Sequence, residues 1–429
     1  MSSLTQPSAL QSVCPRCGAT IEVTPGFVAW CEACDWNLRP SVAAAPTSFT
    51  AKFYAAFGQR AGQLVFTQLR GASSLKPGIT PSWVAAMLFA LAIHLLTLAV
   101  LAGGVYLVVT NRPYFLIEIF GAVLIALGLC MVPRVPKYPA KVASRDDFPA
   151  LYEAAGKAAR AVGANPPHAT VLDVKYNASY SRAGWRRRQV LTLGLPLLAI
   201  LDEREIVALL GHEMAHGVNG DSTYGFFIGS AVDALGRWHD MLYPTSSSAI
   251  VTQRGAAPLA TLLVRPILML LAQIPRGAAF ILIHLLWQDS QRAEYLADSL
   301  AAKAAGTEAV LSLLAKFQLA PLVQFTVQNA ATGSSHEGLL QLLRKRCDML
   351  PPAEWKRLDR VGRLEQSRLD CTHPPTSLRI ALLEARVVAQ PTVQIDLDTW
   401  RRLESALARL DPTATRMLIV NYRDRLYRH

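Results

Sequence analysis

The chain has 429 residues, of which 52% are apolar and 17% are charged, and its formal net charge is +12. Soluble globular domains are usually about 45–50% apolar and about 25% charged. The shortage of charge argues against an ordinary soluble enzyme, and the apolar content excludes a mainly disordered chain. The positive charge alone is compatible with binding to nucleic acid, with binding to anionic lipid, or with positively charged loops beside membrane spans.

Four of the seven cysteines form two Cys-x-x-Cys pairs near the N-terminus: Cys14 with Cys17, and Cys31 with Cys34. Each pair puts two thiols on one tight turn, and two such turns can complete a tetrahedral shell around zinc. The spacing predicts a zinc ribbon over residues 1–40 that holds one structural Zn²⁺. The alternatives are two disulfides or a redox Cys-x-x-Cys motif. Residues 41–80 are expected to form a linker with a short amphipathic stretch.

Two apolar segments come next, residues 83–109 without a formal charge and residues 114–132 with one, Glu118. At about 1.5 Å per residue, the first exceeds the roughly 30 Å thickness of a bilayer core. We therefore expect a transmembrane hairpin over residues 81–133, with a buried core hairpin as the alternative. Several Lys and Arg residues flank the hairpin, whereas Arg112 alone lies in its turn. This distribution predicts that both ends of the hairpin lie in the cytoplasm.

Residues 224–287 form a second apolar region, but charged residues interrupt it, among them Asp233 and Arg265. A charge at the centre of a span costs about 2.5–3.5 kcal/mol on insertion scales, so these residues need partners or a cavity. We expect two further spans here. The alternative is one span plus a helix that is buried or lies in the membrane interface.

Residues 211–217 read Gly-His-Glu-Met-Ala-His-Gly. On a helix, His212 and His216 lie one turn apart on one face and can bind one Zn²⁺, with Glu213 beside the metal. Asp202 and Glu205 are three residues apart and predict a capped start for this helix. The alternative is a pair of core histidines with an exposed glutamate.

Glu294 and Asp298 also lie one helical turn apart, in a segment that follows the second apolar region. We expect Glu294 to complete a ligand set of two histidines and one glutamate. Asp298 would then accept a hydrogen bond from the second ring N–H of His212. Taken alone, this segment would be interpreted as a solvated acidic face.

These motifs together resemble the HtpX-like membrane zinc metalloproteases, relatives of the CAAX prenyl endopeptidases in the gluzincin group. The resemblance covers roughly residues 80–385. It rests on the His212–His216 motif, on the segment Arg292–Asp298, and on Thr372–Ile380, which is similar to the family's His-Pro segment. A weaker match is Tyr176–Ser179, because Ser179 stands where the family usually has an aromatic residue.

The resemblance implies a mainly α fold, a multi-span helical protein of a bacterial-type cytoplasmic membrane whose gluzincin-type catalytic domain, residues 134–385, carries a small β-hairpin or sheet. From the positions of Lys and Arg, we expect the N-terminus and this domain to face the cytoplasm. The resemblance implies one catalytic Zn²⁺, with Glu213 as the general base that activates water. It also implies that His373 donates a hydrogen bond to the tetrahedral oxyanion and that Arg379 fixes the acidic side of the site.

Weak alternation in residues 170–174 and 189–193 predicts a small hairpin beside the catalytic helix. Its edge at Asn177 and Ala178 could bind substrate as an added strand. The basic cluster in residues 182–188 would either contact lipid headgroups or form a solvated turn. Residues 386–429 are expected to be a helical segment, and the chain shows no nucleic-acid-binding pattern.

The sequence therefore predicts a membrane-embedded zinc endopeptidase that hydrolyses peptide bonds of membrane or misfolded proteins. The first alternative is a prenyl-protein endopeptidase, which differs in its substrate and not in its mechanism. The second alternative is a non-catalytic membrane adaptor whose zinc ribbon recruits a protein partner.

Overall fold

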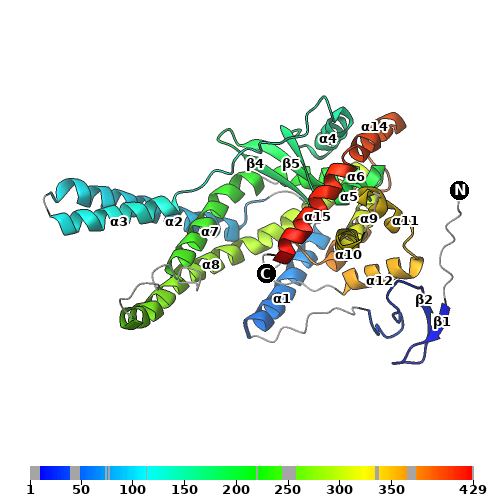
Figure 1. Ribbon diagram of the computed structural model, residues 1–429, viewed down its shortest axis with the longest axis horizontal. Coiled ribbons are helices and arrows are strands. Elements are labelled where there is room, and N and C mark those ends of the chain that lie inside the picture. The colour runs from blue at the N-terminus through cyan, green and yellow to red at the C-terminus, as the bar shows by residue number, and fades with distance from the viewer. Residues whose placement is uncertain are drawn as a thin grey trace. The chain divides into compact units, whose positions relative to one another are not determined.

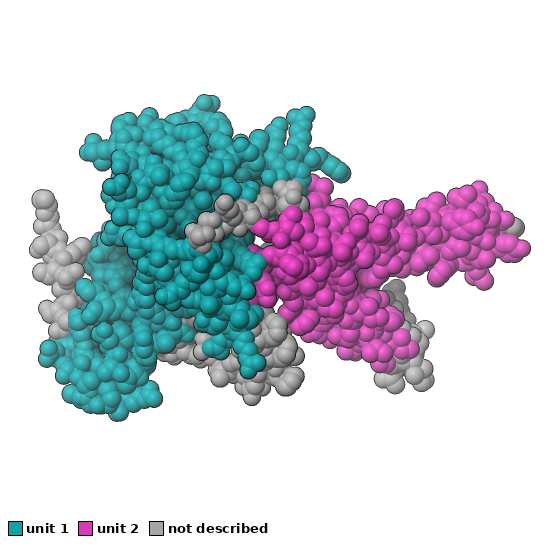
Figure 2. All heavy atoms as spheres, turned by 180° about the vertical axis from the view of Figure 1, so that it is seen from behind, with its two compact units in different colours: residues 1–76, 137–219, 291–429 teal, residues 77–136, 220–290 magenta. Residues whose placement is uncertain are grey.

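The computed structural model describes residues 10–38, 49–72, 75, 78–112, 114–218, 221–243, 258–333, 338–364 and 373–427. The chain forms two compact units, which Figure 2 distinguishes by colour, and the residue ranges of the two units alternate along the sequence. The first unit contains residues 1–76, 137–219 and 291–429, and the second contains residues 77–136 and 220–290. Every site residue predicted from the sequence belongs to the first unit.

The second unit is helical. It contains α2 (Pro81–Thr110), α3 (Phe115–Met131), α7 (Asp221–Leu242) and the first part of α8 (Pro258–Ala305). Helices α2 and α3 pack closely where Gly104 meets Gly121, because a Cβ atom on Gly104 would lie 2.7 Å from the carbonyl oxygen of Gly121. Small residues allow such close backbone approach between apolar helices.

Among the described residues, two helices are long and apolar enough to cross a membrane, α2 and the part of α8 over residues 265–305. Helix α3 is shorter and has 17 residues, and a third candidate arises only if α9 (Thr307–Phe317) and α10 (Ala320–Thr332), which bend by 47°, count as one span. Of the two further spans expected in residues 224–287, the described residues therefore supply one, α8. Helix α7 carries Arg237, whose guanidinium donates to the carbonyl oxygen of Cys130 at 2.7 Å.

A three-stranded sheet in the first unit contains β3 (Ala169–Asp173), β4 (Ala178–Ala183) and β5 (Arg188–Gly194) in the order β3-β5-β4. The prediction of a hairpin between residues 170–174 and 189–193 was wrong, because β3 and β5 pair in parallel. The hairpin joins β4 to β5 instead. Strand β4 escaped the sequence pattern because its side chains are mostly small or polar, and an edge strand needs few apolar residues.

Helix α6 (Glu203–Val218) forms the centre of the first unit and packs against α4 (Pro149–Val162), α9 and strand β4 (Figure 1). Ile206, Leu209, Leu210 and Met214 are fully buried. The predicted capped start is confirmed: the N–H of Glu205 donates to Asp202 at 2.9 Å, and the N–H of Asp202 donates to the Glu205 carboxylate at 2.7 Å. This reciprocal capping stabilises the first turn of α6.

The rest of the first unit surrounds α6 with short elements. They are β1 (Leu10–Val13), β2 (Thr20–Val23), α1 (Phe49–Gly71), α5 (Leu195–Leu198), α11 (Leu339–Asp348), α12 (Pro352–Arg363), α13 (Thr376–Ala385), α14 (Leu397–Ala408) and α15 (Asp411–Tyr427). Helix α1 occupies much of the stretch expected to be a linker. It packs on the region of the predicted site, because its residues Val65 and Phe66 form one buried cluster with Tyr295 and Leu382.

Candidate metal centre

Two helices bring together the three residues predicted to bind the catalytic metal. His212 and His216 project from α6, and Glu294 projects from α8. The Nε2 atom of His212 lies 3.6 Å from one Glu294 oxygen, and the Nε2 atom of His216 lies 3.5 Å from the other. Their ligand atoms all lie within 4.8 Å of one another. The three side chains therefore converge on one point.

These three residues have the donor types and the spacing that a zinc ion needs. In a tetrahedral shell with ligand distances of about 2.0–2.1 Å, donor atoms are separated by roughly 3.4 Å. The separations of 3.5 and 3.6 Å in the structure are close to this value. One oxygen of the buried Glu294 has no hydrogen-bond partner among the described residues. A bound cation would satisfy this oxygen, so the residues fit a metal.

Asp298 contacts His212, and Arg379 in turn contacts Asp298. The Nδ1 atom of His212 lies 3.0 Å from an Asp298 oxygen, on the side opposite to its metal-facing nitrogen. Arg379 of α13 donates two hydrogen bonds to Asp298 at 2.7 and 2.6 Å. Burial alone would lower the pKa of Arg379, but the carboxylates of Asp298 and Glu294 raise it above its ordinary value. Arg379 is therefore a fixed positive charge beside two buried carboxylates.

Glu213 and His373 are placed differently around this centre. Glu213 is buried on α6 and directly follows His212 in the sequence. His373 precedes α13 and is 61% exposed, and its Nδ1 atom lies 2.9 Å from a Glu294 oxygen. His373 thus touches the acidic residue of the cluster, a contact that the sequence did not indicate. Residue Thr372, part of the same family motif, lies outside the described residues.

The predicted substrate edge lies beside the same helix. Ala178 begins β4 and pairs with Leu193 of β5, while the carbonyl of Asn177 accepts a hydrogen bond from the N–H of Gly194 at 2.9 Å. Strand β4 is an edge of its sheet. The ring of Tyr180 in β4 packs against Gly217, next to His216. The structure thus brings the edge strand close to the end of the His-Glu-x-x-His motif.

The four N-terminal cysteines also cluster. The Sγ atoms of Cys14 and Cys34 are 3.7 Å apart, and those of Cys17 and Cys31 are 3.6 Å apart. Four thiolates at about 2.3 Å from a tetrahedral zinc would be separated by roughly 3.8 Å. Burial raises the pKa of Cys14, but hydrogen bonds from the N–H groups of Arg16 and Cys17 outweigh it and lower this pKa to about 7. Burial and the neighbouring thiols raise the pKa of Cys34 to about 12, so it is the sulfur spacing that fits a metal. The cluster could therefore hold a metal ion.

The ribbon is attached to α12, which the sequence analysis did not anticipate. The indole N–H of Trp30 donates to the carbonyl oxygen of Ala353 at 3.2 Å. Arg357 donates to the carbonyl oxygen of Leu38 at 2.8 Å, and Arg360 binds both oxygens of Asp35 at 3.0 and 2.9 Å. The sequence contained little sign of this contact, because no local pattern connects the tryptophan and the arginines, which lie more than 300 residues apart in the chain.

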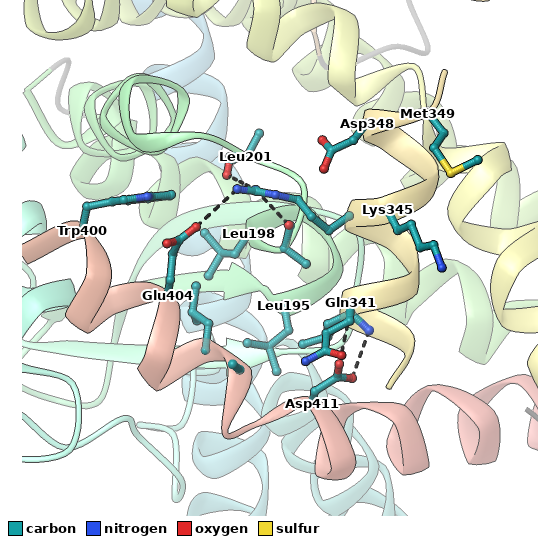
Figure 3. A pocket seen from close by; sticks show the side chains of 15 residues that line it. Leu195, Leu198, Leu201, Gln341, Lys345, Asp348, Met349, Trp400, Glu404 and Asp411 are labelled. Carbon is teal, nitrogen blue, oxygen red and sulfur yellow. Dashed lines mark hydrogen bonds and ion pairs between the residues drawn. The ribbon is translucent and has the colours of Figure 1, made fainter. Parts of the chain in front are cut away.

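A cavity of about 450 Å³ lies between α5, α11 and α14, with apolar walls that include Leu195 and Leu198 (Figure 3). Arg344 crosses its wall and donates to the carbonyl oxygens of Ala199 and Leu201 at 3.1 and 2.6 Å. None of its lining residues is among the predicted site residues. The cavity is thus separate from the metal cluster, and no sequence motif indicated it.

A buried His-Glu-x-x-His helix joined by a glutamate from a second helix is the arrangement of a metallopeptidase. Comparison with known families agrees with this class: peptidase family M48 matches residues 147–387. Because the match covers more than half of the chain, the protein belongs to peptidase family M48, whose members are metal-dependent and typically use zinc. The predicted resemblance to this HtpX- and CAAX-type family is confirmed. Comparison with curated proteins and with solved structures gives no match.

Proposed function

We propose that this protein is a membrane-embedded zinc endopeptidase that hydrolyses peptide bonds of membrane or misfolded proteins. The convergence of His212, His216 and Glu294 from two helices carries this proposal. When bound there, zinc would lower the pKa of a water molecule and polarise the peptide carbonyl. A second, structural zinc would be held by Cys14, Cys17, Cys31 and Cys34.

Each residue around the centre has a role that its position permits. Glu213 accepts the proton of the attacking water and delivers it to the leaving amine. His373 donates a hydrogen bond to the developing oxyanion, which requires its side chain to turn from Glu294 toward the substrate. Asp298, held by Arg379, keeps His212 in the tautomer with a free Nε2 atom. The backbone at Asn177 and Ala178 binds the substrate as an added strand, so side-chain preference is loose.

The proposed membrane location rests on the apolar surface of α2 and α8 that the rest of the protein leaves exposed. Only 22% of the most apolar window of α2 is buried by the protein, and only 17% of that of α8. Exposed apolar surface on this scale is typical of contact with lipid. With both ends of the α2–α3 hairpin in the cytoplasm, the ribbon and the catalytic residues would act there. The membrane anchor would then restrict the enzyme to substrates in or near the bilayer.

Metal analysis of purified variants tests the ligand assignment. The wild-type protein should contain two zinc ions per chain, His212→Ala should lose one of them, and Cys14→Ser should lose the other. Each variant is the control for the other, because the two sites share no residue. Retention of both ions by His212→Ala would disprove the catalytic ligand set.

Cleavage assays test the reaction and the substrate class. Glu213→Gln should keep both zinc ions and lose cleavage of casein, because only the proton acceptor is removed. Retained proteolysis by this variant would remove Glu213 from its role. A farnesylated peptide assayed beside casein separates the proposal from a prenyl-protein endopeptidase, since the latter would cleave only the prenylated substrate. Extraction of native membranes with alkaline carbonate should leave the protein in the pellet.

A further inference from the structure

The turn between β4 and β5 forms an exposed basic tip that the proposed catalytic chemistry does not use. We define the tip as residues 182–188, with the sequence Arg-Ala-Gly-Trp-Arg-Arg-Arg. Trp185 lies at its end and is 90% exposed. A single exposed apolar side chain is normal on a protein surface, so Trp185 gains its meaning from the basic residues around it.

The shape of the tip is fixed by the backbone. Gly184 has a φ of +70° and Arg187 has a φ of 50°, and the N–H of Arg187 donates to the carbonyl oxygen of Gly184 at 2.9 Å. The left-handed conformation at Gly184 costs little because glycine has no side chain, whereas at Arg187 it is unfavourable. The turn therefore presents Trp185 and the arginines in one defined arrangement.

The sequence around the tip is strongly basic. Residues 174–201 contain five basic residues and no acidic residue. Burial and the neighbouring charge of Arg182 lower the pKa of Arg187. The Nε atom of Arg182 is buried and has no hydrogen-bond partner among the described residues. A cluster of like charges of this kind attracts anionic partners.

The chain connects the tip to an apolar helix. Tyr138 packs against Gly184, and the guanidinium of Arg188 lies 5.8 Å from the centre of the Tyr138 ring. Tyr138 follows the end of α3 at Met131 by only seven positions, in a segment that also contains Arg134, Lys137 and Lys141. Tryptophan, tyrosine and arginine are the residues that anchor proteins at the headgroup level of a bilayer.

We propose that the tip of the β4–β5 hairpin binds the surface of a bilayer that contains anionic phospholipids, with Trp185 at headgroup depth and the arginines on lipid phosphates. This inference rests on the proposed membrane location. Strand β4 has six residues and is therefore roughly 20 Å long at about 3.3 Å per residue. Contact at the tip would hold the substrate edge at Ala178 at about that distance from the lipid surface, where a strand leaving the membrane can reach it.

Tryptophan fluorescence of the full-length protein in vesicles tests the proposal. The vesicles contain phosphatidylcholine brominated high on its acyl chains, with or without about one part in three of phosphatidylglycerol. The signal of Trp185 is the difference between the wild-type protein and Trp185→Phe. We expect bromine to quench this difference in the anionic vesicles and to quench it much less in phosphatidylcholine alone.

Two double variants test the role of the arginines. Arg186→Ser with Arg188→Ser should weaken attachment of the tip by roughly tenfold or more, because each arginine near an anionic surface contributes. The quenching should then require a higher phosphatidylglycerol content. Arg401→Ser with Arg409→Ser removes the same charge from exposed positions on and just after α14 and should change nothing. Cleavage of a soluble peptide should stay at the wild-type level in both variants, which shows that they fold.

The contrary outcomes are distinguishable. Quenching of the whole protein through Trp83 and Trp287 of α2 and α8, without quenching of Trp185, would overturn the tip contact and leave the membrane location standing. Absence of any quenching would overturn both. Equal quenching of Trp185 with and without phosphatidylglycerol would disprove the role of the arginines. RNA binding that is lost in the Arg186 and Arg188 variant, with no lipid quenching, would assign the tip to nucleic acid instead.

Discussion

The guanidinium of Arg379 binds both carboxylate oxygens of Asp298, and the same carboxylate lies 3.0 Å from the Nδ1 atom of His212. This chain of contacts joins α13 to α8 and α8 to α6. Side chains that contact a ligand histidine in this way hold its ring orientation and its tautomer. The order of the proposed metal centre would therefore depend on Arg379, which is not one of the proposed metal ligands.

Arg379→Lys is expected to weaken zinc binding at the catalytic site by about 10- to 100-fold, because lysine cannot make two parallel hydrogen bonds to Asp298. Competition with a chelator measures this affinity. The matched control is Arg363→Lys, since Arg363 forms partly exposed ion pairs with Asp359 and Glu384. An unchanged zinc affinity in Arg379→Lys would show that Asp298 orients His212 without help.

His373→Ala separates two roles for this histidine. If His373 acts on the oxyanion, kcat should fall by about 10²- to 10³-fold while zinc affinity stays constant, and this is the result we expect. If its contact with Glu294 only positions that ligand, zinc affinity should fall as well. Steady-state kinetics and chelator competition on the same preparation distinguish the two, and unchanged kcat would exclude the oxyanion role.

Lys316→Met is expected to destabilise the first unit by about 3–5 kcal/mol, because it leaves the buried Glu205 carboxylate without its cation. The ammonium of Lys316 lies 2.6 Å from Glu205, whose side chain is only 2% exposed. Chemical denaturation followed by circular dichroism measures the loss. Lys157→Met breaks the more exposed pair with Glu153 and should cost about 1 kcal/mol or less. Equal losses in the two variants would contradict the argument from burial.

Trp30→Ala is expected to release the ribbon from α12, since removal of a buried indole and its hydrogen bond costs about 3 kcal/mol. Amide hydrogen exchange in α12 should become faster, while both zinc ions remain bound. The control is Trp185→Ala, which removes an exposed indole and should leave exchange in α12 unchanged. Loss of the ribbon zinc in Trp30→Ala would mean that docking on α12 and metal binding are one event.

Local patterns predicted much of the candidate site. Residues one helical turn apart must share a face, so the spacing of His212 and His216 and that of Glu294 and Asp298 could be interpreted before any contact was known. The start of α6 at Asp202 was predictable for the same reason, because a capping box is complete within four residues. The apolar run at α2 needed only its length and the absence of charge.

Pairings between distant segments were not predictable from such patterns. The parallel pairing of β3 with β5 depends on where β4 lies, and the small and polar residues of β4 give no periodic signal. The contact between the ribbon and α12 was also not predictable, because the local sequence around Trp30 and around Arg360 does not indicate which segment each residue contacts. Helix α7 has a helical pattern, but its charges made its place in or beside a membrane ambiguous.

The sequence by itself determined the type of chemistry, since the donor residues and their spacing on single helices are local properties of the chain. Glu294 lies beside both histidines, as the sequence analysis expected. The tertiary structure alone decided that His373 touches Glu294 and that the edge strand β4 lies beside α6. These contacts arise when the core around α6 packs and the conformational entropy of the long intervening segments is overcome. Short-range sequence patterns carry no information about this balance of packing and entropy, so these contacts could be found only in the folded structure.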